Sequence, residues 1–420
     1  MISELAEQHV VVRSEGRRTG TTPGRCANGV STRDTGRVPG SVSRERAVRA
    51  VELDGRTNSL NLIRLVLALM VLFAHGFYIA GAGSGPGFRG ESLGGWAVLG
   101  FFTISGFLIT ASRFAKSFGT YLLHRVARIF PAFLVCLVVT AGVVAPIAYW
   151  SEHRDFTGFF STGTSPIGYI LSNALLKVNA QDVAGTPGAV PYPGTWNGSL
   201  WTLWFEFCCY LIVGVLILLP VVRRRRWIVT VAFAVSVVVW ANIDRLLPHL
   251  GGNVDLELLA RLAPPFLGGA VVQTVIRRVP LQAARAMAAA VLAGASVWFI
   301  QGWGAQLAAP LITYALLWLS TVLPSPAMIR RHDISYGAYI YAFPVQQLLT
   351  YAGAHRLGVY VFDALAVVAT AVPAALSWRF IERPVMRWAR RAGRRSTRPS
   401  GSDPPPMSAP EPSPGGLMRP

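Results

Sequence analysis

The chain has 420 residues, of which 52% are hydrophobic and only 14% are charged. A soluble domain carries about 25% charged residues, so this composition excludes an ordinary soluble protein and indicates several membrane-spanning helices. The formal net charge of +19 would suit a nucleic-acid-binding protein. The basic residues lie between apolar runs, however, which is the pattern of membrane topology. We therefore expect membrane lipids, and no nucleic acid, as partners.

Composition divides the chain into three parts. Residues 1–56 are rich in Arg, Gly, Ser and Thr without apolar periodicity, so we expect a disordered cytoplasmic arm. Residues 393–420 are rich in Pro and Ser and are expected to form a disordered cytoplasmic tail. Between them, residues 57–392 are predicted to form one all-α domain, a polytopic membrane bundle of about ten transmembrane helices.

Ten apolar runs are predicted as spans: 59–80, 93–112, 129–149, 199–220, 227–243, 257–276, 284–301, 304–323, 334–354 and 360–381. Arg and Lys are concentrated in the loops at one end of these runs. Basic loops stay on the cytoplasmic side, so we expect a multi-pass protein of the cell membrane with both termini cytoplasmic. An eleventh span or a re-entrant piece within 156–178 stays open, because that stretch is moderately apolar.

The first run contains two residues that a bilayer disfavours, Arg64 and His75. An ionisable side chain inside a span costs roughly 2.5–3.5 kcal/mol, so such residues usually face a protein interior and carry function. Eleven residues are three helical turns plus about 20°, so both side chains lie on one face, about 16 Å apart. The structural alternative is that Arg64 extends to one membrane interface and His75 to the other.

The second run carries Ser105 and Gly106 near its middle. They are expected either to let helices pack closely, as small residues do in membranes, or to line a substrate tunnel.

The turn into the third run carries Arg125 and Arg128, which share a helix face at spacing i, i+3. Paired guanidinium groups bind phosphates well, so together with Arg64 they form a candidate site for acyl-coenzyme A. The alternative is the ordinary positive charge of cytoplasmic loops, which is the favoured interpretation of Arg113 and Lys116.

The fourth run follows a long external segment, 150–198, and contains Glu206. Measured from the outer ends of their spans, Glu206 is about 10 Å deep and His75 about 7–8 Å deep. We therefore expect the Glu206 carboxylate to orient the imidazole and to stabilise its protonated form. The alternative is a carboxylate satisfied by Trp or Tyr donors. Trp201, at the start of this run, is a further candidate for the tunnel wall.

Two acidic residues lie near the inner ends of the last two runs. Asp333 is expected, as an alternative to Ser335, to cap the ninth helix. Glu382 is expected to form a structural ion cluster with its neighbours Arg379 and Arg383.

The four cysteines are Cys26, Cys136, Cys208 and Cys209. Their spacing indicates neither a disulfide framework nor a metal site. We expect no metal, and no cofactor apart from acyl-coenzyme A as the donor substrate.

Six stretches, taken in chain order, resemble the acyltransferase 3 family of integral membrane acyltransferases. Arg64 and His75 are similar to its R-x10-H signature, and the other stretches are VLGFFTISGFLI, RVARIFPAF, LWTLWFEFCCYL, ISYGAYIYAFPV and FIERP. The sequence departs from the family pattern at Ala342, where a His is usual. The resemblance covers about residues 56–390.

The resemblance implies an O-acyltransferase that moves an acyl group, most simply acetyl, from cytoplasmic acyl-coenzyme A to a hydroxyl. The acceptor would be a carbohydrate, a glycolipid or a glycosylated natural product. His75 would act as the general base, and the Arg residues would place the donor. The main rival is a transporter or flippase for a polar lipid or sugar, in which the same buried charges line a pathway. A second rival is a membrane sensor or scaffold without activity.

Overall fold

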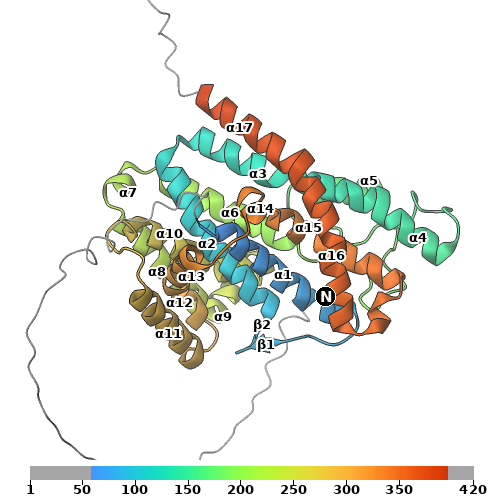
Figure 1. The fold of residues 1–420 in the computed structure, drawn as a ribbon, viewed down its shortest axis with the longest axis horizontal. Helices are drawn as coiled ribbons and strands as arrows, with labels where there is room; N and C mark the ends of the chain where they lie inside the picture. The colour runs from blue at the N-terminus through green and yellow to red at the C-terminus, as the bar shows by residue number, and fades with distance from the viewer. Residues whose placement is uncertain (1–57, 396–420) are drawn as a thin grey trace, which may run out of the picture.

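The computed structural model describes residues 58–395, and this part of the chain is mostly helical, with two short strands and several loops (Figure 1). The first elements are α1 (Leu60–Ile79), β1 (Gly87–Phe88), β2 (Glu91–Ser92), α2 (Leu93–Ala115), α3 (Phe118–Val139), the π-helical turn η3 (Thr140–Val144), α4 (Ala145–His153), α5 (Pro166–Asn173), α6 (Trp201–Leu216) and α7 (Pro220–Arg224). The two short strands pair antiparallel, with Phe88 opposite Glu91.

The remaining elements are α8 (Trp227–Ala241), α9 (Ile243–Leu246), η4 (Leu247–Leu250), α10 (Val254–Val275), α11 (Ala283–Phe299), α12 (Gly304–Leu307), α13 (Ala309–Val322), α14 (Ala327–Arg331), α15 (Ser335–Tyr351), η5 (Ala354–Leu357), α16 (Val359–Ser377), the π-helical turn η6 (Trp378–Glu382) and α17 (Arg383–Arg395). The predicted arm, 1–56, and the predicted tail from residue 396 lie outside the described residues. The expected start of the tail at residue 393 falls within the last turn of α17, which ends at Arg395, so the described helix runs slightly further than the predicted domain.

Each predicted apolar run contains a helix, because in hydrocarbon a chain segment has to satisfy its own backbone hydrogen bonds. Polar residues fix several helix starts. Ser92, Ser117 and Ser165 each accept a hydrogen bond from the backbone N–H three residues further on, at the starts of α2, α3 and α5.

Five helices in the described part are long and apolar enough to cross a bilayer: Leu60–Ile79, Leu93–Ala115, Phe118–His153, Val254–Val275 and Val359–Gly393. A sixth span results if Trp227–Ala241 and Ile243–Leu250, which are bent by 69°, act together. Three further apolar helices, α6, α11 and α13, are shorter. The all-α architecture and its membrane character are thus confirmed, whereas the number of ten spans stays a prediction.

Helix α2 lies at the centre of the bundle and packs against α1, α10 and α13. Its contact with α10 brings the two backbones together. A Cβ atom at Gly106 would lie 1.8 Å from the carbonyl oxygen of Phe266, and one at Gly269 would lie 2.0 Å from that of Thr103. Such close packing of small residues is a typical helix contact in membranes.

Two continuous helices are longer than a bilayer is thick. One covers α3, η3 and α4 in 36 residues, and the other covers α16, η6 and most of α17 in 35 residues. At 1.5 Å per residue each is roughly 50 Å long, about 20 Å more than the hydrocarbon layer. The start of α3 and the end of α17 pack against each other, with His124 Nε2 3.3 Å from the carbonyl oxygen of Ala389.

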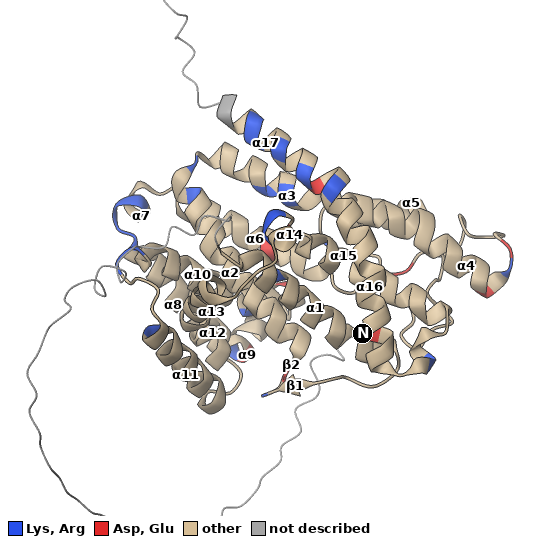
Figure 2. Cartoon of the chain, viewed as in Figure 1, with Lys and Arg blue, Asp and Glu red and all other residues tan. Residues whose placement is uncertain are grey.

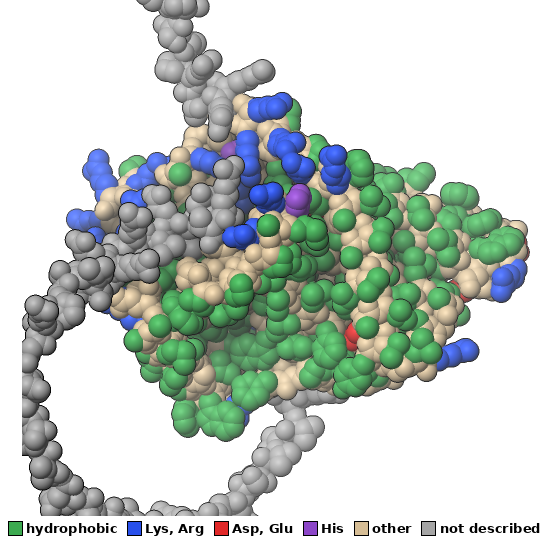
Figure 3. Space-filling model, viewed as in Figure 1, with side chains coloured by type: hydrophobic (Ala, Val, Ile, Leu, Met, Phe, Trp, Pro, Cys, Tyr) green, Lys and Arg blue, Asp and Glu red, His purple; other side chains and the backbone are tan. Residues whose placement is uncertain are grey.

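Positive charge gathers at one side of the molecule. Figure 2 shows Lys and Arg positions in blue on α7 at the left of the view, on α17 and the first half of α3 at the top, and on α14 near the centre. We call this the basic side. Figure 3 shows hydrophobic side chains covering most of the remaining surface of this face. The separation of basic and apolar surface agrees with the predicted topology; the assignment of the basic side to the cytoplasm stays a prediction.

The segment between α4 and α6 folds back into the bundle. Its helix α5 has eight residues, too few to cross a membrane, and packs against α3 and η3. Asn197 Nδ2 donates hydrogen bonds to the Tyr169 hydroxyl at 2.6 Å and to Thr140 Oγ1 at 3.0 Å. Thr140 lies twelve residues beyond Arg128, about 18 Å along α3, so this segment reaches far below the outer ends of the spans.

Candidate active site

Helix α1 carries Arg64 and His75 on one face, as the sequence predicts, with Arg64 at the end nearer the basic side. The separation of eleven residues is about 16 Å along the axis. Arg64 Nη1 donates to Asp333 Oδ2 at 2.5 Å. The two ends of this face therefore have different surroundings, one ionic and one largely aromatic.

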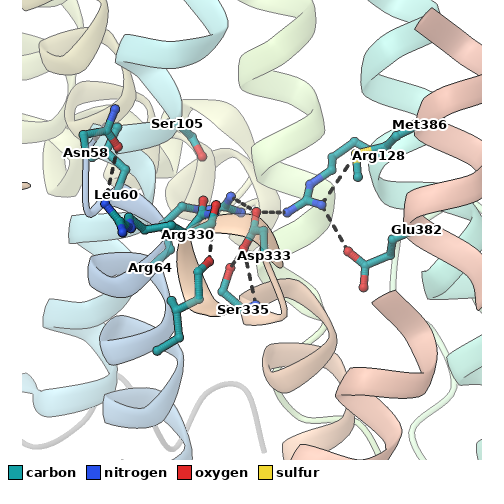
Figure 4. A network of polar contacts seen from close by, with 12 residues as sticks. Asn58, Leu60, Arg64, Ser105, Arg128, Arg330, Asp333, Ser335, Glu382 and Met386 are labelled. Carbon is teal, nitrogen blue, oxygen red and sulfur yellow. Dashed lines mark hydrogen bonds and ion pairs between the residues drawn. The ribbon is translucent and has the colours of Figure 1, made fainter. Parts of the chain in front are cut away.

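Asp333, in the turn between α14 and α15, is the centre of an ion network (Figure 4). Its Oδ2 also accepts from Arg128 Nη2 at 2.7 Å, and Arg128 Nη1 reaches Glu382 Oε2 at 3.1 Å. Burial alone would raise the pKa of Asp333, but the guanidinium groups of Arg64 and Arg128 lower it to about 2. We call these four residues the ion network; it joins α1, α3, the turn before α15, and η6.

The sequence predictions for the two carboxylates need correction. Asp333 Oδ1 does accept a hydrogen bond from Ser335 Oγ at 2.5 Å, but its other oxygen binds two arginines distant in sequence. Glu382 pairs with Arg128 and accepts from Ser377 Oγ at 3.1 Å. Within residues 58–395 no ion pair joins Glu382 to Arg379 or Arg383, which are the partners expected from sequence.

Arg125 differs from the other two predicted donor-binding arginines. Among the described contacts it has no carboxylate partner, and its Nε is buried without a hydrogen bond. Its guanidinium carbon lies 5.9 Å from the centre of the Tyr210 ring. Arg64 and Arg128 are each paired with Asp333, so Arg125 is the one of the three without a carboxylate partner among the described contacts.

Glu206 does not make the predicted contact with His75. Its Oε1 accepts hydrogen bonds from Ser105 Oγ at 2.8 Å and from the Tyr210 hydroxyl at 2.6 Å. Within the described residues no hydrogen bond or ion pair joins Glu206 to His75. A Tyr donor is the structural alternative that the sequence left open.

The reason for this correction is the depth at which α6 begins. Thr202 Oγ1 lies 2.6 Å from the hydroxyl of Tyr339, which is only six residues, or about 9 Å, beyond Asp333 on α15. Glu206 lies one turn further towards the basic side. The carboxylate is therefore close to the level of the ion network, more than two turns of α1 away from the level of His75.

His75 lies in an aromatic environment. The centre of its ring is 5.4 Å from that of Tyr78 and 5.3 Å from that of Phe343. Tyr192, from the segment between α4 and α6, lies 4.8 Å from Tyr78 in the same measure. His75 Nδ1 is buried and has no hydrogen-bond partner, while the residue as a whole is only partly buried. One nitrogen of the imidazole is thus closed off by protein, while part of the His75 surface stays exposed.

A profile of acyltransferase domains matches residues 57–378. The chain belongs to the acyltransferase 3 family. It is 29% identical over 335 residues to a protein named O-acetyl transferase from Shigella phage Sf6, covering 78% of this chain and 96% of the phage protein. It is 26% identical over 381 residues to nodulation protein 10 of Rhizobium leguminosarum bv. viciae, covering 79% and 94%. No solved structure matches the chain.

This acyltransferase 3 protein is therefore an enzyme, an O-acyltransferase whose partners are an acyl donor and a hydroxyl acceptor. The resemblance predicted from its six motifs is confirmed. Family membership favours the enzyme over the transporter and over the inactive scaffold.

The three residues predicted to line a tunnel in this acyltransferase have different positions. Ser105 donates to Glu206 Oε1, and Figure 4 draws Ser105 in the same close view as the ion network. Gly106 is buried against α10, so the structure favours its packing role. Trp201 is half-buried at the first turn of α6 and packs edge-on against Phe205 at 5.8 Å.

Two buried ionisable residues of the acyltransferase were not predicted from sequence. Arg113 was interpreted as ordinary loop charge, but its side chain is fully buried and donates to the carbonyl oxygens of Gly214 and Lys116, each at 3.0 Å. Asp363 is buried in α16, against α1. An acidic residue in the apolar run 360–381 was the signal that would have identified it.

The described residues contain no group of three or more His, Cys, Asp or Glu side chains that could hold a metal ion. Within the same residues Cys136, Cys208 and Cys209 are free thiols.

Proposed function

We propose that the protein is an O-acetyltransferase that uses acetyl-coenzyme A on the basic side and acetylates a hydroxyl of a carbohydrate, a glycolipid or a glycosylated natural product. The observation that carries this proposal is the arrangement on α1, which joins a cluster of guanidinium groups to an accessible imidazole about 16 Å away. The similarity to a protein named O-acetyl transferase supports acetyl as the transferred group.

The donor would bind with its phosphates at the basic side. Arg125 is the principal candidate, because its guanidinium has no carboxylate partner among the described contacts. Arg64 and Arg128 would contribute by exchanging part of their contact with Asp333 for the donor, since phosphate accepts paired hydrogen bonds from guanidinium as carboxylate does. The thioester would then extend past Ser105 towards His75.

His75 would act as the general base. The acceptor O–H bond breaks as its proton moves to the accessible nitrogen of the imidazole, Nε2, and the oxygen attacks the thioester carbonyl. The carbon–sulfur bond then breaks, and the coenzyme A thiolate takes the proton from the imidazolium. The aromatic side chains around His75 offer an apolar face to the ring of an acceptor sugar.

The test is acyl transfer by purified protein in lipid nanodiscs with acetyl-coenzyme A, measured as free coenzyme A thiol. Octyl glucoside serves as the probe acceptor, and water as the background acceptor. His75→Ala should lower the rate at least 100-fold, the usual contribution of a general base, while the exposed His249→Ala should match wild type. Wild-type turnover in His75→Ala would refute the assignment. A protein that moves a sugar across the bilayer without consuming donor would instead favour the transporter.

Arg125→Ala should raise the KM for acetyl-coenzyme A at least tenfold, with a smaller effect on kcat, because a donor-phosphate contact acts mainly on binding. The exposed Arg225→Ala, also on the basic side, provides the control for general loss of positive charge. Equal KM values in the two variants would contradict the placement of the donor.

We further propose that the protein lies in the cytoplasmic membrane with the basic side in the cytoplasm, where acyl-coenzyme A is made. The distribution of Arg and Lys supports this orientation (Figure 2).

A further inference from the structure

A buried carboxyl group on α16 has no part in the function proposed above. Asp363 is 4% exposed and lies in an apolar helix that belongs to one of the long membrane-crossing elements. An acidic side chain at such a position carries an insertion cost, so it is retained where a neighbouring group makes use of it.

The Asp363 side chain occupies the space that Gly76 leaves on α1. A Cβ atom at Gly76 would lie 1.8 Å from Asp363 Oδ1, so only glycine permits this contact. Gln346 on α15 completes the arrangement, because its Nε2 donates to the carbonyl oxygen of Leu72 at 2.9 Å and to Asp363 Oδ1 at 3.3 Å. Three helices are thus joined at the residue that directly follows His75.

Three polar atoms around this contact are buried and have no hydrogen-bond partner. They are Asp363 Oδ2, Gln346 Oε1 and His75 Nδ1. Given the 1.8 Å approach at Gly76 and the geometry of adjacent helical residues, the Asp363 carboxyl lies within about 10 Å of the imidazole ring. Asp363 therefore has a carboxyl oxygen without a hydrogen-bond partner near the imidazole of His75, which would become positively charged during the reaction.

Other ionisable groups near α1 do not supply this charge. The helices that pack against α1 include α2, α13, α14, α15 and α16. The charged residues of these helices other than Asp363 lie at the basic side: Arg113, Arg330 and Arg331. The titratable side chains of α13 and α15, Tyr360 of α16, and Tyr78 and Tyr192 beside the ring are all tyrosines, which are neutral near pH 7. Glu206 accepts hydrogen bonds from Ser105 and Tyr210, and within the described residues none joins it to His75.

We propose that Asp363, rather than Glu206, is the carboxylate that serves His75, as a positioning residue that acts across Gly76. It stabilises the imidazolium that forms when His75 takes the acceptor proton, and with Gln346 it fixes the turn of α1 that carries the imidazole. This inference rests on His75 being the general base.

The experiment is the pH profile of kcat/KM for coenzyme A release in nanodiscs, with octyl glucoside as probe acceptor. Loss of the negative charge makes His75 less basic, so Asp363→Asn should shift the acidic limb to lower pH by roughly one unit. It should also reduce kcat at the plateau. Asp363→Glu, which keeps the charge, should restore the position of the limb. Glu206→Gln is the matched control and should leave the limb in place even if it lowers the rate.

An acidic limb that is the same in wild type and Asp363→Asn, or one that shifts in Glu206→Gln instead, overturns the inference. If Asp363→Asn does not yield folded protein by size-exclusion chromatography, the smaller Asp363→Ser gives the same neutral test and the same expected shift. Failure of the proposed function is recognised separately, because His75→Ala would then retain activity whatever the profile of the Asp363 variants.

Discussion

Arg128 uses both ends of its guanidinium on protein carboxylates, Asp333 and Glu382. Two guanidinium groups and two carboxylates thus compensate one another within the ion network before any ligand arrives. The sequence grouped Arg64 with Arg128 because both lie near the predicted cytoplasmic ends of their spans, and the structure shows both paired with Asp333. The sequence did not reveal their partners, because Asp333 and Glu382 lie more than 200 residues away along the chain and pattern reasoning pairs charges only within one helix.

The ion network sets a pH dependence of stability. Since the folded-state pKa of Asp333 is about 2, below its ordinary value of 3.8, its ionisation stabilises the fold above that value and the stabilisation is lost as the pH falls towards 2. Asp333→Asn should therefore be less stable at neutral pH but lose less stability than wild type on acidification from about pH 5 to about pH 3. Thermal unfolding in detergent across this range is the measurement; parallel curves for the two proteins would contradict the assignment.

Gly106 allows a second test at the scale of one residue. Gly106→Ala places a methyl group against the carbonyl oxygen of Phe266, and neither backbone can move without separating α2 from α10. Overpacking of this kind costs about 1–3 kcal/mol or more, so a clear fall in melting temperature is expected. Gly294→Ala is the control, because an added Cβ there meets nothing within 4 Å. Equal melting temperatures would show that the two backbones are not in contact.

At the scale of elements, the apolar runs predicted where helices form along the sequence, but not the depth in the membrane at which each helix begins. The Glu206 prediction failed because it assumed that α6 starts at the membrane surface. The first turn of α6 instead lies deeper, where Thr202 contacts the hydroxyl of Tyr339. Hydropathy cannot report this, since a segment that folds back into a bundle satisfies its polar groups through specific partners such as Asn197. The sequence motif identified Glu206, but only the structure shows that its partners are Ser105 and Tyr210.

The contact between this segment and α3 is expected to contribute measurably to stability. Asn197→Ala would leave the Tyr169 hydroxyl and Thr140 Oγ1 without their buried donor. An unsatisfied buried group costs about 1–3 kcal/mol, so the melting temperature in detergent should fall by several degrees. Asn242→Ala, at a partly buried position after α8 where the side chain donates an exposed hydrogen bond to the carbonyl oxygen of Val238, should change it little. If both variants melt alike, the segment is not held by this hydrogen-bonded triad.

For the whole molecule, charge asymmetry predicts which side faces the cytoplasm. In a variant without native cysteines, Ser161→Cys should react with a membrane-impermeant maleimide in intact cells, because it is exposed in the external segment. Arg225→Cys, exposed at the basic side, should react only after the membrane is permeabilised. The reverse labelling pattern would show the opposite orientation in the membrane, and the donor would then enter from the other side.

Helix α1 also has a mechanical consequence for the choice of donor. An α-helix that is hydrogen-bonded throughout does not stretch, so the distance along the axis of α1 from Arg64 to His75 stays constant at about 16 Å. A ligand anchored by its phosphates at one end can present its reactive carbon at the other only if its arm has that reach. The enzyme would then select donors first by the length of the arm between the phosphates and the thioester, and only then by the nature of the acyl group.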